Sequence, residues 1–415
     1  MTTLNQTPRG DRLHIAIFGR RNAGKSSLIN ALTRQEAAIV SAVPGTTTDP
    51  VKKSMEILPI GPVVIIDTAG IDDVGELGEK RIAMTLRILD QTNLAILVLD
   101  PQQGIDGYED GLLAQFRERK TSVIAVANKI DVHPDYSGAK AWARDRGLPF
   151  AAVSAMAGEG IEDLKRVMID VAPDDFVEPA IIGDLLNPGD IAVLVIPVDK
   201  AAPKGRLILP QVMALRDVID HDAYAVVVKE RELRDALENL RKKPKIVVTD
   251  SQAVLKASAD TPRDVPFTTF SILFGRYKGD LEILARGANA MRRLKPGAKV
   301  LIAEACTHHQ VADDIGTVQI PRWLRQYAGG EIEFDYVSGG DFPPDVEKYD
   351  LIVHCGACML NRQEMLARLK KADAMGIPII NYGVFLSFVH GVLERALEPF
   401  PLARMAYEEG GEQAG

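Results

Sequence analysis

One short segment near the N-terminus constrains the fold of this chain more than any other. The apolar run Leu13–Phe18 leads directly into Gly19–Ser27, which reads GRRNAGKSS, and a helical pattern follows. The segment matches G-x-x-x-x-G-K-[ST] in the strand–turn–helix setting that a phosphate-binding loop requires. Backbone N–H groups of such a loop and of the following helix surround phosphate oxygens. We therefore expect a nucleotide site at this turn.

The side chains of this loop are expected to have separate roles. The ammonium group of Lys25 can reach the β- and γ-phosphates, and the hydroxyl of Ser26 can ligate Mg²⁺. A loop of purely structural use is the alternative reading. The residues expected to line the nucleotide here are Gly19, Asn22, Ala23, Gly24, Lys25, Ser26 and Ser27.

A second motif follows the next hydrophobic strand, in the order that a GTPase requires. Asp67-Thr-Ala-Gly70 comes at the end of the apolar run Val63–Ile66. Its carboxylate can hold the Mg²⁺ shell, and the backbone N–H of Gly70 can sense the γ-phosphate. The phosphate loop and this motif together predict hydrolysis of the bound nucleotide.

Two later motifs indicate guanine as the base. Asn128-Lys129-Ile-Asp131 ends a buried strand, and the carboxylate of Asp131 can accept the two neighbouring N–H donors of guanine. Adenine lacks that donor pair, so ATP would leave a buried carboxylate without partners. Ser154-Ala155 fits the loop whose backbone N–H meets the guanine O6. The chain is therefore predicted to bind GTP with Mg²⁺.

These residues resemble the TrmE–Era–EngA branch of translation-factor-like GTPases. The resemblance rests on Asn22 and on Pro44-Gly-Thr-Thr-Thr-Asp49. It implies Thr47 (Thr46 as the alternative) as the Mg²⁺-binding switch threonine, and Asn22 as a ligand of a K⁺ ion that assists catalysis beside Lys25. Asn22 as a simple turn residue is the other reading. Members of this branch lack a catalytic glutamine directly after the Asp-Thr-Ala-Gly motif, and Ile71 occupies that position here. The resemblance therefore implies slow, K⁺-stimulated hydrolysis.

Apolar runs alternate with amphipathic stretches along the chain, which predicts an α/β protein with mainly parallel sheets. We expect three domains: a P-loop GTPase domain at 1–172, a small α/β domain at 180–265, and a doubly wound α/β domain at 266–415. The middle unit has little core of its own, and such small units often pair, so homodimerisation through it is a hypothesis. A monomeric connector is the alternative.

The three cysteines of the chain lie together in the third region. They occur in Cys306-Thr-His308-His309 and in His354-Cys355-Gly-Ala-Cys358, each directly after a strand-like run. If the two strands are parallel neighbours, both loops emerge at one sheet edge, where open α/β sheets place ligands. Buried inert thiols, a Cys₃His zinc site and an iron–sulfur cluster on three cysteines all remain open.

This cysteine pattern behind such a GTPase domain resembles the HydF family of FeFe-hydrogenase maturation GTPases. The resemblance covers essentially the whole chain and implies a 4Fe–4S cluster on Cys306, Cys355 and Cys358. It leaves the fourth cluster position open between a histidine, an aspartate and an exogenous ligand such as water. The candidates in the chain are His308, His309, His354, Asp313 and Asp314; His354 could instead point away, and the two acids could cap a helix.

The resemblance also implies a function and partners. The chain would be a GTP-hydrolysing scaffold that carries a transient di-iron precursor of the hydrogenase active site. The radical-SAM maturases HydE and HydG would contribute to that precursor, and the apo-hydrogenase HydA would receive it. A ribosome- or tRNA-associated GTPase with a zinc-stabilised accessory domain is the alternative, and a redox-sensing GTPase is a third.

Charge and hydropathy exclude other classes. Residues 301–415 hold 17 acidic and 9 basic side chains, which accounts for the whole net charge of −8 and leaves the first 300 residues balanced. A nucleic-acid binder usually carries a basic face, so no nucleic-acid partner is expected. No apolar run approaches the roughly 20 residues of a membrane span, so no membrane partner is expected. Three cysteines without a disulfide framework favour the cytoplasm.

Overall fold

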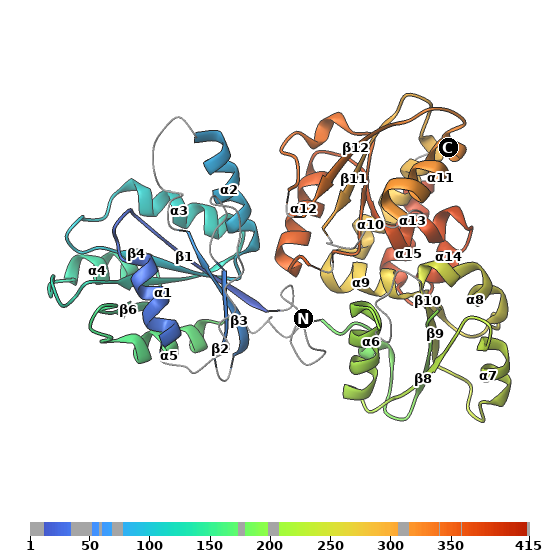
Figure 1. Ribbon diagram of the computed structural model, residues 1–415, viewed down its shortest axis with the longest axis horizontal. Helices are drawn as coiled ribbons and strands as arrows, with labels where there is room; N and C mark the ends of the chain where they lie inside the picture. Colours follow the sequence, from blue (N-terminus) through green and yellow to red (C-terminus); the bar gives the residue numbers. More distant parts are fainter. Residues whose placement is uncertain are drawn as a thin grey trace. The chain divides into compact units, whose positions relative to one another are not determined.

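The computed structural model describes residues 12–34, 52–57, 60–68, 78–172, 179–197, 207–305, 315–339, 341–357 and 359–412. The chain forms two compact units, residues 1–177 and 178–415, each described here by itself (Figure 1). The first unit holds one six-stranded sheet, and the second holds two sheets of four strands each. No helix in these ranges is long and apolar enough to cross a membrane.

The first sheet has the strand order β2-β3-β1-β4-β5-β6, and all neighbours are parallel except β2 and β3. This confirms the predicted α/β class and the mainly parallel sheet. Its strands are β1 Leu13–Gly19, β2 Lys52–Ile57, β3 Gly61–Asp67, β4 Leu94–Leu99, β5 Ser122–Ala127 and β6 Phe150–Ala152. The helices are α1 Lys25–Arg34, α2 Gly78–Gln91, α3 Gly107–Glu118, α4 Ser137–Asp145 and α5 Ile161–Val171.

The strands of this sheet are buried on both faces, which explains their continuous apolar sequences. Along β1, Leu13, Ile15 and Ile17 join one core cluster with α1 and α5. Ala16 and Phe18 point the other way and join a second cluster with α2, α3 and α4. Because successive side chains of a strand alternate between faces, one apolar run supplies both cores. The sheet is thereby held rigid beneath its carboxyl-end loops.

The second sheet has the all-parallel order β10-β9-β7-β8. Its elements are β7 Ile191–Val195, α6 Leu209–Asp220, β8 Tyr224–Val228, α7 Leu233–Asn239, β9 Ile246–Thr249, α8 Val254–Asp260 and β10 Phe267–Thr269. The expected end of the middle domain at residue 265 falls just before β10, yet β10 pairs with β9. The second sheet therefore extends past that boundary, because three residues of β10 complete its buried edge.

The third sheet, also parallel throughout, has the order β12-β11-β13-β14. Its strands are β11 Lys299–Glu304, β12 Glu333–Ser338, β13 Leu351–His354 and β14 Ile379–Asn381. The order places β11 and β13 side by side, which is the condition under which the two cysteine loops emerge at one edge of the sheet. The helices around it are α9 Phe270–Lys278, α10 Leu281–Gly287, α11 Ile320–Ala328, α12 Arg362–Ala374, α13 Tyr382–Val389, α14 Leu393–Leu397 and α15 Pro401–Glu412.

One continuous hydrophobic cluster runs through both sheets of the second unit. It joins Val193 and Val247 of the second sheet to Leu301 and Ile352 of the third, through Phe270 and its neighbours on α9. Buried Arg395 of α14 adds hydrogen bonds to backbone carbonyl oxygens beside α8, including that of Thr261 at 2.8 Å. The two small sheets thus share a core that neither could build alone.

Candidate functional site

The phosphate loop between β1 and α1 has a backbone that only certain residues can adopt. Gly19 has a φ of +145°, and a Cβ there would lie 2.4 Å from the carbonyl oxygen of Val98. Gly24 has a φ of +91°, and a Cβ would lie 2.2 Å from Nδ2 of Asn128. Asn22 is left-handed at +62°, a conformation that asparagine tolerates better than most residues. The spacing of the motif therefore reflects steric limits of this turn.

Lys25 and Ser26 begin α1 directly above the carboxyl end of β1. The buried ammonium of Lys25 donates to the carbonyl oxygens of Gly19 and Arg20, the latter at 2.9 Å. These contacts hold the side chain curled over the loop, where phosphates would lie. The hydroxyl of Ser26 donates to Oδ2 of Asp67 at 2.9 Å. The structure thus brings together the two oxygen ligands expected for Mg²⁺.

Asn128 connects the base-recognition motifs to the phosphate loop. Its Nδ2 donates to the carbonyl oxygen of Ala23 at 2.9 Å, and its Oδ1 accepts from the backbone N–H of Ala155 at 3.1 Å. Ser154 is fully buried, and its hydroxyl oxygen accepts from the backbone N–H of Ala157 at 3.1 Å. One buried amide therefore fixes three loops relative to one another.

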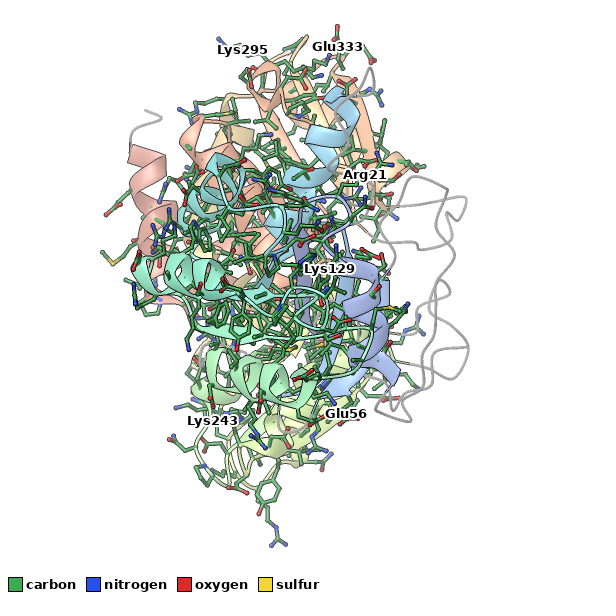
Figure 2. All side chains as sticks on the ribbon, turned by 90° about the vertical axis from the view of Figure 1, so that its left-hand side faces the viewer. Arg21, Glu56, Lys129, Lys243, Lys295 and Glu333 are labelled. Carbon is green, nitrogen blue, oxygen red and sulfur yellow. The ribbon has the colours of Figure 1, made fainter. Side chains whose placement is uncertain are left out.

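Lys129 and Asp131 flank the position where a base would stack. Lys129 has a positive φ of +66°, and its ammonium lies 2.7 Å from Oδ2 of Asp100. Burial opposes ionisation of Asp100, but hydrogen bonds from Lys129 and from the backbone of Gln102 hold its pKa below the usual value. The Asp131 side chain is exposed and can meet guanine. Lys129 and Arg21 are labelled on the face of this unit that Figure 2 turns toward the viewer.

A network around Arg20 was not anticipated from the sequence. The guanidinium of Arg20 donates to both carboxylate oxygens of Glu109, at 2.6 and 2.9 Å, and also contacts Asp106. Hydrogen bonds with Glu109 and then Asp106 raise the pKa of Arg20. Glu109 is buried and belongs to the capping box that starts α3. This ion pair ties the phosphate loop to α3, and because the loop motif allows any residue at that position, no sequence signal marks it.

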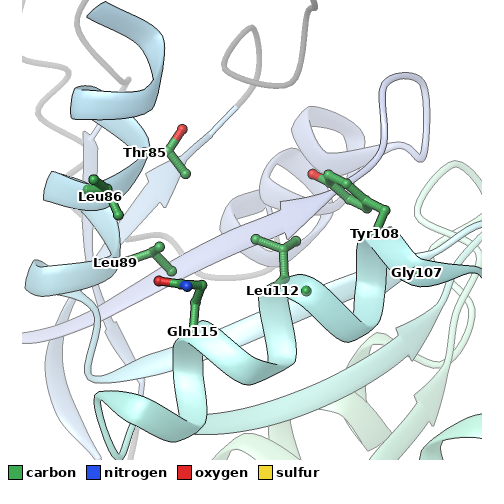
Figure 3. Close-up of a pocket in the computed structure, with 8 residues that line it drawn as sticks. Thr85, Leu86, Leu89, Gly107, Tyr108, Leu112 and Gln115 are labelled. Atoms are coloured by element: carbon green, nitrogen blue, oxygen red, sulfur yellow. The ribbon is translucent and has the colours of Figure 1, made fainter. Parts of the chain in front are cut away.

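A shallow hollow on this unit lies between α2 and α3, outside the motifs (Figure 3). Leu86 and Leu89 of α2 face Tyr108 and Leu112 of α3 across it, and its lining is mainly apolar. It offers no cluster of phosphate-binding groups. The nucleotide site is therefore assigned to the strand-end loops.

Cys355 occupies the edge of the third sheet where β11 and β13 end together. The thiol is buried, and its Sγ accepts from the backbone N–H groups of Ala305 at 3.0 Å and Ala357 at 3.4 Å. Ala305 directly precedes Cys306 in the sequence. Ala357, with φ +54°, forms the tight turn that leads to Cys358. Two backbone N–H groups therefore point at one sulfur at this sheet edge.

His354, the last residue of β13, has both ring nitrogens engaged. Its Nε2 lies 3.0 Å from a guanidinium nitrogen of Arg368, and its Nδ1 lies 2.9 Å from the carbonyl oxygen of Cys355. Arginine can only donate, so Nε2 accepts and the ring proton is on Nδ1. The imidazole is completely buried. In this arrangement His354 faces α12 and supports the cysteine backbone.

The carboxylate of Glu304 is a further possible metal ligand near the cysteines, and it was not predicted from the sequence. It ends β11 two residues before Cys306, and its Oε1 accepts from the hydroxyl of Tyr382 at 2.9 Å. A Cβ on Gly316 would lie 2.0 Å from the same oxygen, so a larger residue in the π-helical turn Ile315–Gln319 would displace the Glu304 carboxylate. A glutamate at a strand end has no distinctive spacing, which is why it was missed.

Several predicted site residues lie outside the described residues, so nothing is stated of their positions. In the nucleotide site they are Thr46, Thr47 and Gly70, and in the cysteine region they are Cys306, His308, His309, Asp313, Asp314 and Cys358. Among the residues that the structure does describe, no group of three or more His, Cys, Asp or Glu side chains could hold a metal ion.

Three family models match consecutive parts of the chain. Residues 14–129 match the 50S ribosome-binding GTPase model. Residues 181–279 match the hydrogen maturase F dimerization domain, and residues 282–399 match the hydrogen maturase F tetramerization domain. The last two adjoin between residues 279 and 282, at the start of α10, beyond β10. They agree with a second sheet that includes β10.

Individual relatives match part of the chain, and the chain spans less than half the length of the curated relatives that follow. A tRNA modification GTPase MnmE from Cyanothece sp. is 36% identical over 186 residues, which is 44% of this chain and 39% of that protein. GTPase Der from Nautilia profundicola is 37% identical over 169 residues, covering 38% and 36%. The crystal structure of the G domain of the T. maritima FeoB iron transporter is 27% identical, with a TM-score of 0.31, covering 39% of this chain and 99% of that one.

Proposed function

The chain belongs to the hydrogen maturase F family, and from that membership we propose that it carries a 4Fe–4S cluster and a di-iron precursor of the FeFe-hydrogenase active site. It is a GTPase of hydrogenase maturation, with a GTPase domain followed by the family's dimerization and tetramerization domains. The observation that carries the proposal is the Cys355 sulfur, which receives two backbone N–H groups at the shared end of β11 and β13.

The reaction in the N-terminal unit is hydrolysis of GTP to GDP and phosphate. A water attacks the γ-phosphorus in line, the bond to the β–γ bridging oxygen breaks, and GDP leaves with that oxygen. Lys25 would balance charge on the β- and γ-phosphates. Ser26 and Asp67, which lie within hydrogen-bond distance of each other, would hold the Mg²⁺ ion that neutralises the phosphates. Asp131 and the Ala155 N–H select guanine. These residues mainly position and neutralise, so intrinsic turnover is slow.

We further propose that Asn22 helps bind a K⁺ ion that supplies positive charge near the transferred phosphoryl group. Asn22 has a left-handed backbone and an exposed side chain. The rate of GTP hydrolysis should then be at least about tenfold higher in KCl than in NaCl. This acceleration is smaller than the roughly 10³–10⁵-fold that an arginine finger supplies. Asn22→Gly keeps the positive φ and should abolish the difference. Equal rates of wild type in the two salts would exclude the K⁺ role.

The residues at the third sheet fit an iron–sulfur cluster. Cys355 is buried beside two N–H donors, those of Ala305 and Ala357. Cys306 directly follows Ala305 in the sequence, and Cys358 directly follows Ala357. A cluster held by three thiolates supplies one iron with an exchangeable ligand, at which another metal fragment can attach. We propose Cys306, Cys355 and Cys358 as ligands. The fourth position stays open among His308, His309, His354, Asp313, Asp314 and an exogenous ligand, and we add Glu304 to these candidates because it ends β11 two residues before Cys306.

Delivery of the precursor is tested directly by a transfer assay. Full-length protein carrying the cluster would be incubated with the radical-SAM maturases HydE and HydG, separated from them, and mixed with apo-hydrogenase HydA. Hydrogen evolution should appear only with the loaded protein. If the maturases activate apo-hydrogenase equally well without this chain, the carrier role is excluded, whereas its GTPase activity would be unaffected.

Self-association is expected to involve the outer edge of the second sheet. β8 pairs only with β7 among the described strands, and it exposes Tyr224 and Val227, which are 64% and 47% accessible. An unpaired apolar edge strand favours pairing with a second copy. Val227→Lys would bury an unpaired charge there and should weaken association at least about tenfold.

Sedimentation of the full chain measures this effect. The mass of the assembled species should fall by half for Val227→Lys, and the tetramerization region should be unaffected. Val132→Lys makes the same change at a position that is 63% accessible in the GTPase unit, and should leave the mass unchanged. An unaltered mass for Val227→Lys would rule out the β8 edge as the dimer contact.

A further inference from the structure

A buried series of hydrogen-bonded polar groups leads from α12 to the proposed cluster ligand Cys355. Glu364 and Arg368 stand one helical turn apart on α12, and both are at least nine-tenths buried. One nitrogen of the Arg368 guanidinium donates to Oε1 of Glu364 at 3.0 Å, and another lies 3.0 Å from Nε2 of His354. Helix and strand are thereby joined through His354, without solvent between them.

Each hydrogen bond in this series determines which atom donates in the next one. Because arginine has no acceptor, it forces Nε2 of His354 to accept and leaves the ring proton on Nδ1. That N–H then donates to the carbonyl oxygen of Cys355 at 2.9 Å. The carbonyl is part of the peptide that begins the Gly356–Ala357 turn, and the Ala357 N–H of that turn reaches the Cys355 sulfur. The hydrogen bonds therefore end at the sulfur atom.

The guanidinium itself is held on all sides. The nitrogen that donates to Glu364 also lies 3.4 Å from the carbonyl oxygen of Gly339, and the ring of Phe342 lies 5.2 Å from the central carbon of the guanidinium. A planar group with several fixed donors can orient an imidazole in a way that a flexible ammonium cannot. Glu364 offsets the buried charge and fixes the guanidinium fork from the helix side.

We propose that Arg368, oriented by Glu364, is a positioning residue that fixes the His354 ring and through it the Cys355 thiolate. The inference rests on the proposed cluster function. It assigns His354 a supporting role, since iron ligation would break one of its two hydrogen bonds inside the core. Partners of this kind outside the ligand set typically change metal affinity by about 10–100-fold.

The test uses the full-length chain after anaerobic reconstitution with iron and sulfide. Arg368→Met removes every donor but keeps the length of the side chain. It should release iron to a chelator about tenfold faster than wild type and alter the EPR spectrum of the reduced cluster. Arg368→Lys restores one donor and should recover part of both properties. Wild type should show no strong hyperfine coupling from a directly bound imidazole of His354.

Two further variants separate positioning from general damage. Arg395→Met removes a similarly buried guanidinium of the same unit, which donates to the hydroxyl of Ser258 and to the carbonyl oxygens of Ser258, Thr261 and Pro262. This variant should release iron at the wild-type rate. If Arg368→Met does not fold because Glu364 is left unpaired, the double variant Arg368→Met/Glu364→Gln removes that charge and should show the same loss. Thermal unfolding of the apo-proteins checks folding.

The outcomes distinguish the inference from its premise. If wild type binds a cluster and folded Arg368→Met matches it in iron release and EPR, the positioning role is wrong while the cluster function stands. An imidazole coupling that His354→Gln removes would overturn it as well. If wild type binds no cluster, the proposed function fails, and the inference fails with it.

Discussion

Lys25→Met is expected to lower the kcat/KM of GTP hydrolysis by about 10²–10³-fold, the typical effect of removing one group that stabilises transition-state charge. The ammonium of Lys25 is buried and held against the carbonyl oxygens of Gly19 and Arg20, so it is already positioned over the phosphate loop. Methionine fills a similar volume but carries no charge. The measurement is phosphate release under single-turnover and steady-state conditions.

The matched control is Lys140→Met, which removes an exposed lysine of the same unit on α4. It should hydrolyse GTP at the wild-type rate. Thermal unfolding without nucleotide shows whether Lys25→Met leaves the domain folded. Hydrolysis by folded Lys25→Met within about twofold of wild type would contradict the role of this lysine, since even one hydrogen-bond donor to the transition state is worth more.

Cys355→Ala is expected to have a comparable effect on the third sheet, by removing most of the bound iron. The affinity for iron should fall by more than the roughly 10–100-fold that is typical when a residue that only supports a ligand is changed. The Cys355 sulfur is the one proposed ligand atom whose surroundings are described, and two backbone N–H groups converge on it. Iron and sulfide per chain after anaerobic reconstitution measure the effect.

The turn beside this cysteine provides a control. Ala357 has a φ of +54°, where glycine is less strained, so Ala357→Gly should retain the cluster and keep the turn. GTP hydrolysis by Cys355→Ala, measured with the variant alone, should equal that of wild type. The residues expected to bind GTP all belong to the first unit, whereas Cys355 belongs to the second. Full iron content in Cys355→Ala would remove this cysteine from the ligand set.

The nucleotide site could be predicted largely from the sequence because its chemistry is local. Gly19, Gly24 and Lys25 belong to a single turn whose geometry requires them, and the later motifs follow the apolar strands β3, β5 and β6. The apolar runs Leu13–Phe18 and Val63–Ile66 lie within β1 and β3. The sequence left the parallel pairing of β11 and β13 as a condition, and the structure has that pairing.

Other features depend on contacts between distant residues and carried no sequence signal. The polar edge strand β2, of sequence KKSMEI, lacks an apolar run because only part of it is buried. The small middle unit gains its core by sharing it with the third sheet, which its length alone could not reveal. Arg20 with Glu109, and Arg368 with His354, are pairs that no motif marks, because their members lie 89 and 14 residues apart in the sequence.

The central claim is that one chain joins a GTPase to a cluster held by three thiolates, and EPR of the reconstituted wild-type protein tests it most directly. The protein would be reconstituted anaerobically, reduced with dithionite, and assayed in parallel for iron, sulfide and zinc. The account predicts the signal of a reduced 4Fe–4S cluster with matching iron and sulfide, lost in Cys306→Ala, Cys355→Ala and Cys358→Ala. A colourless, EPR-silent protein that retains stoichiometric zinc would contradict it.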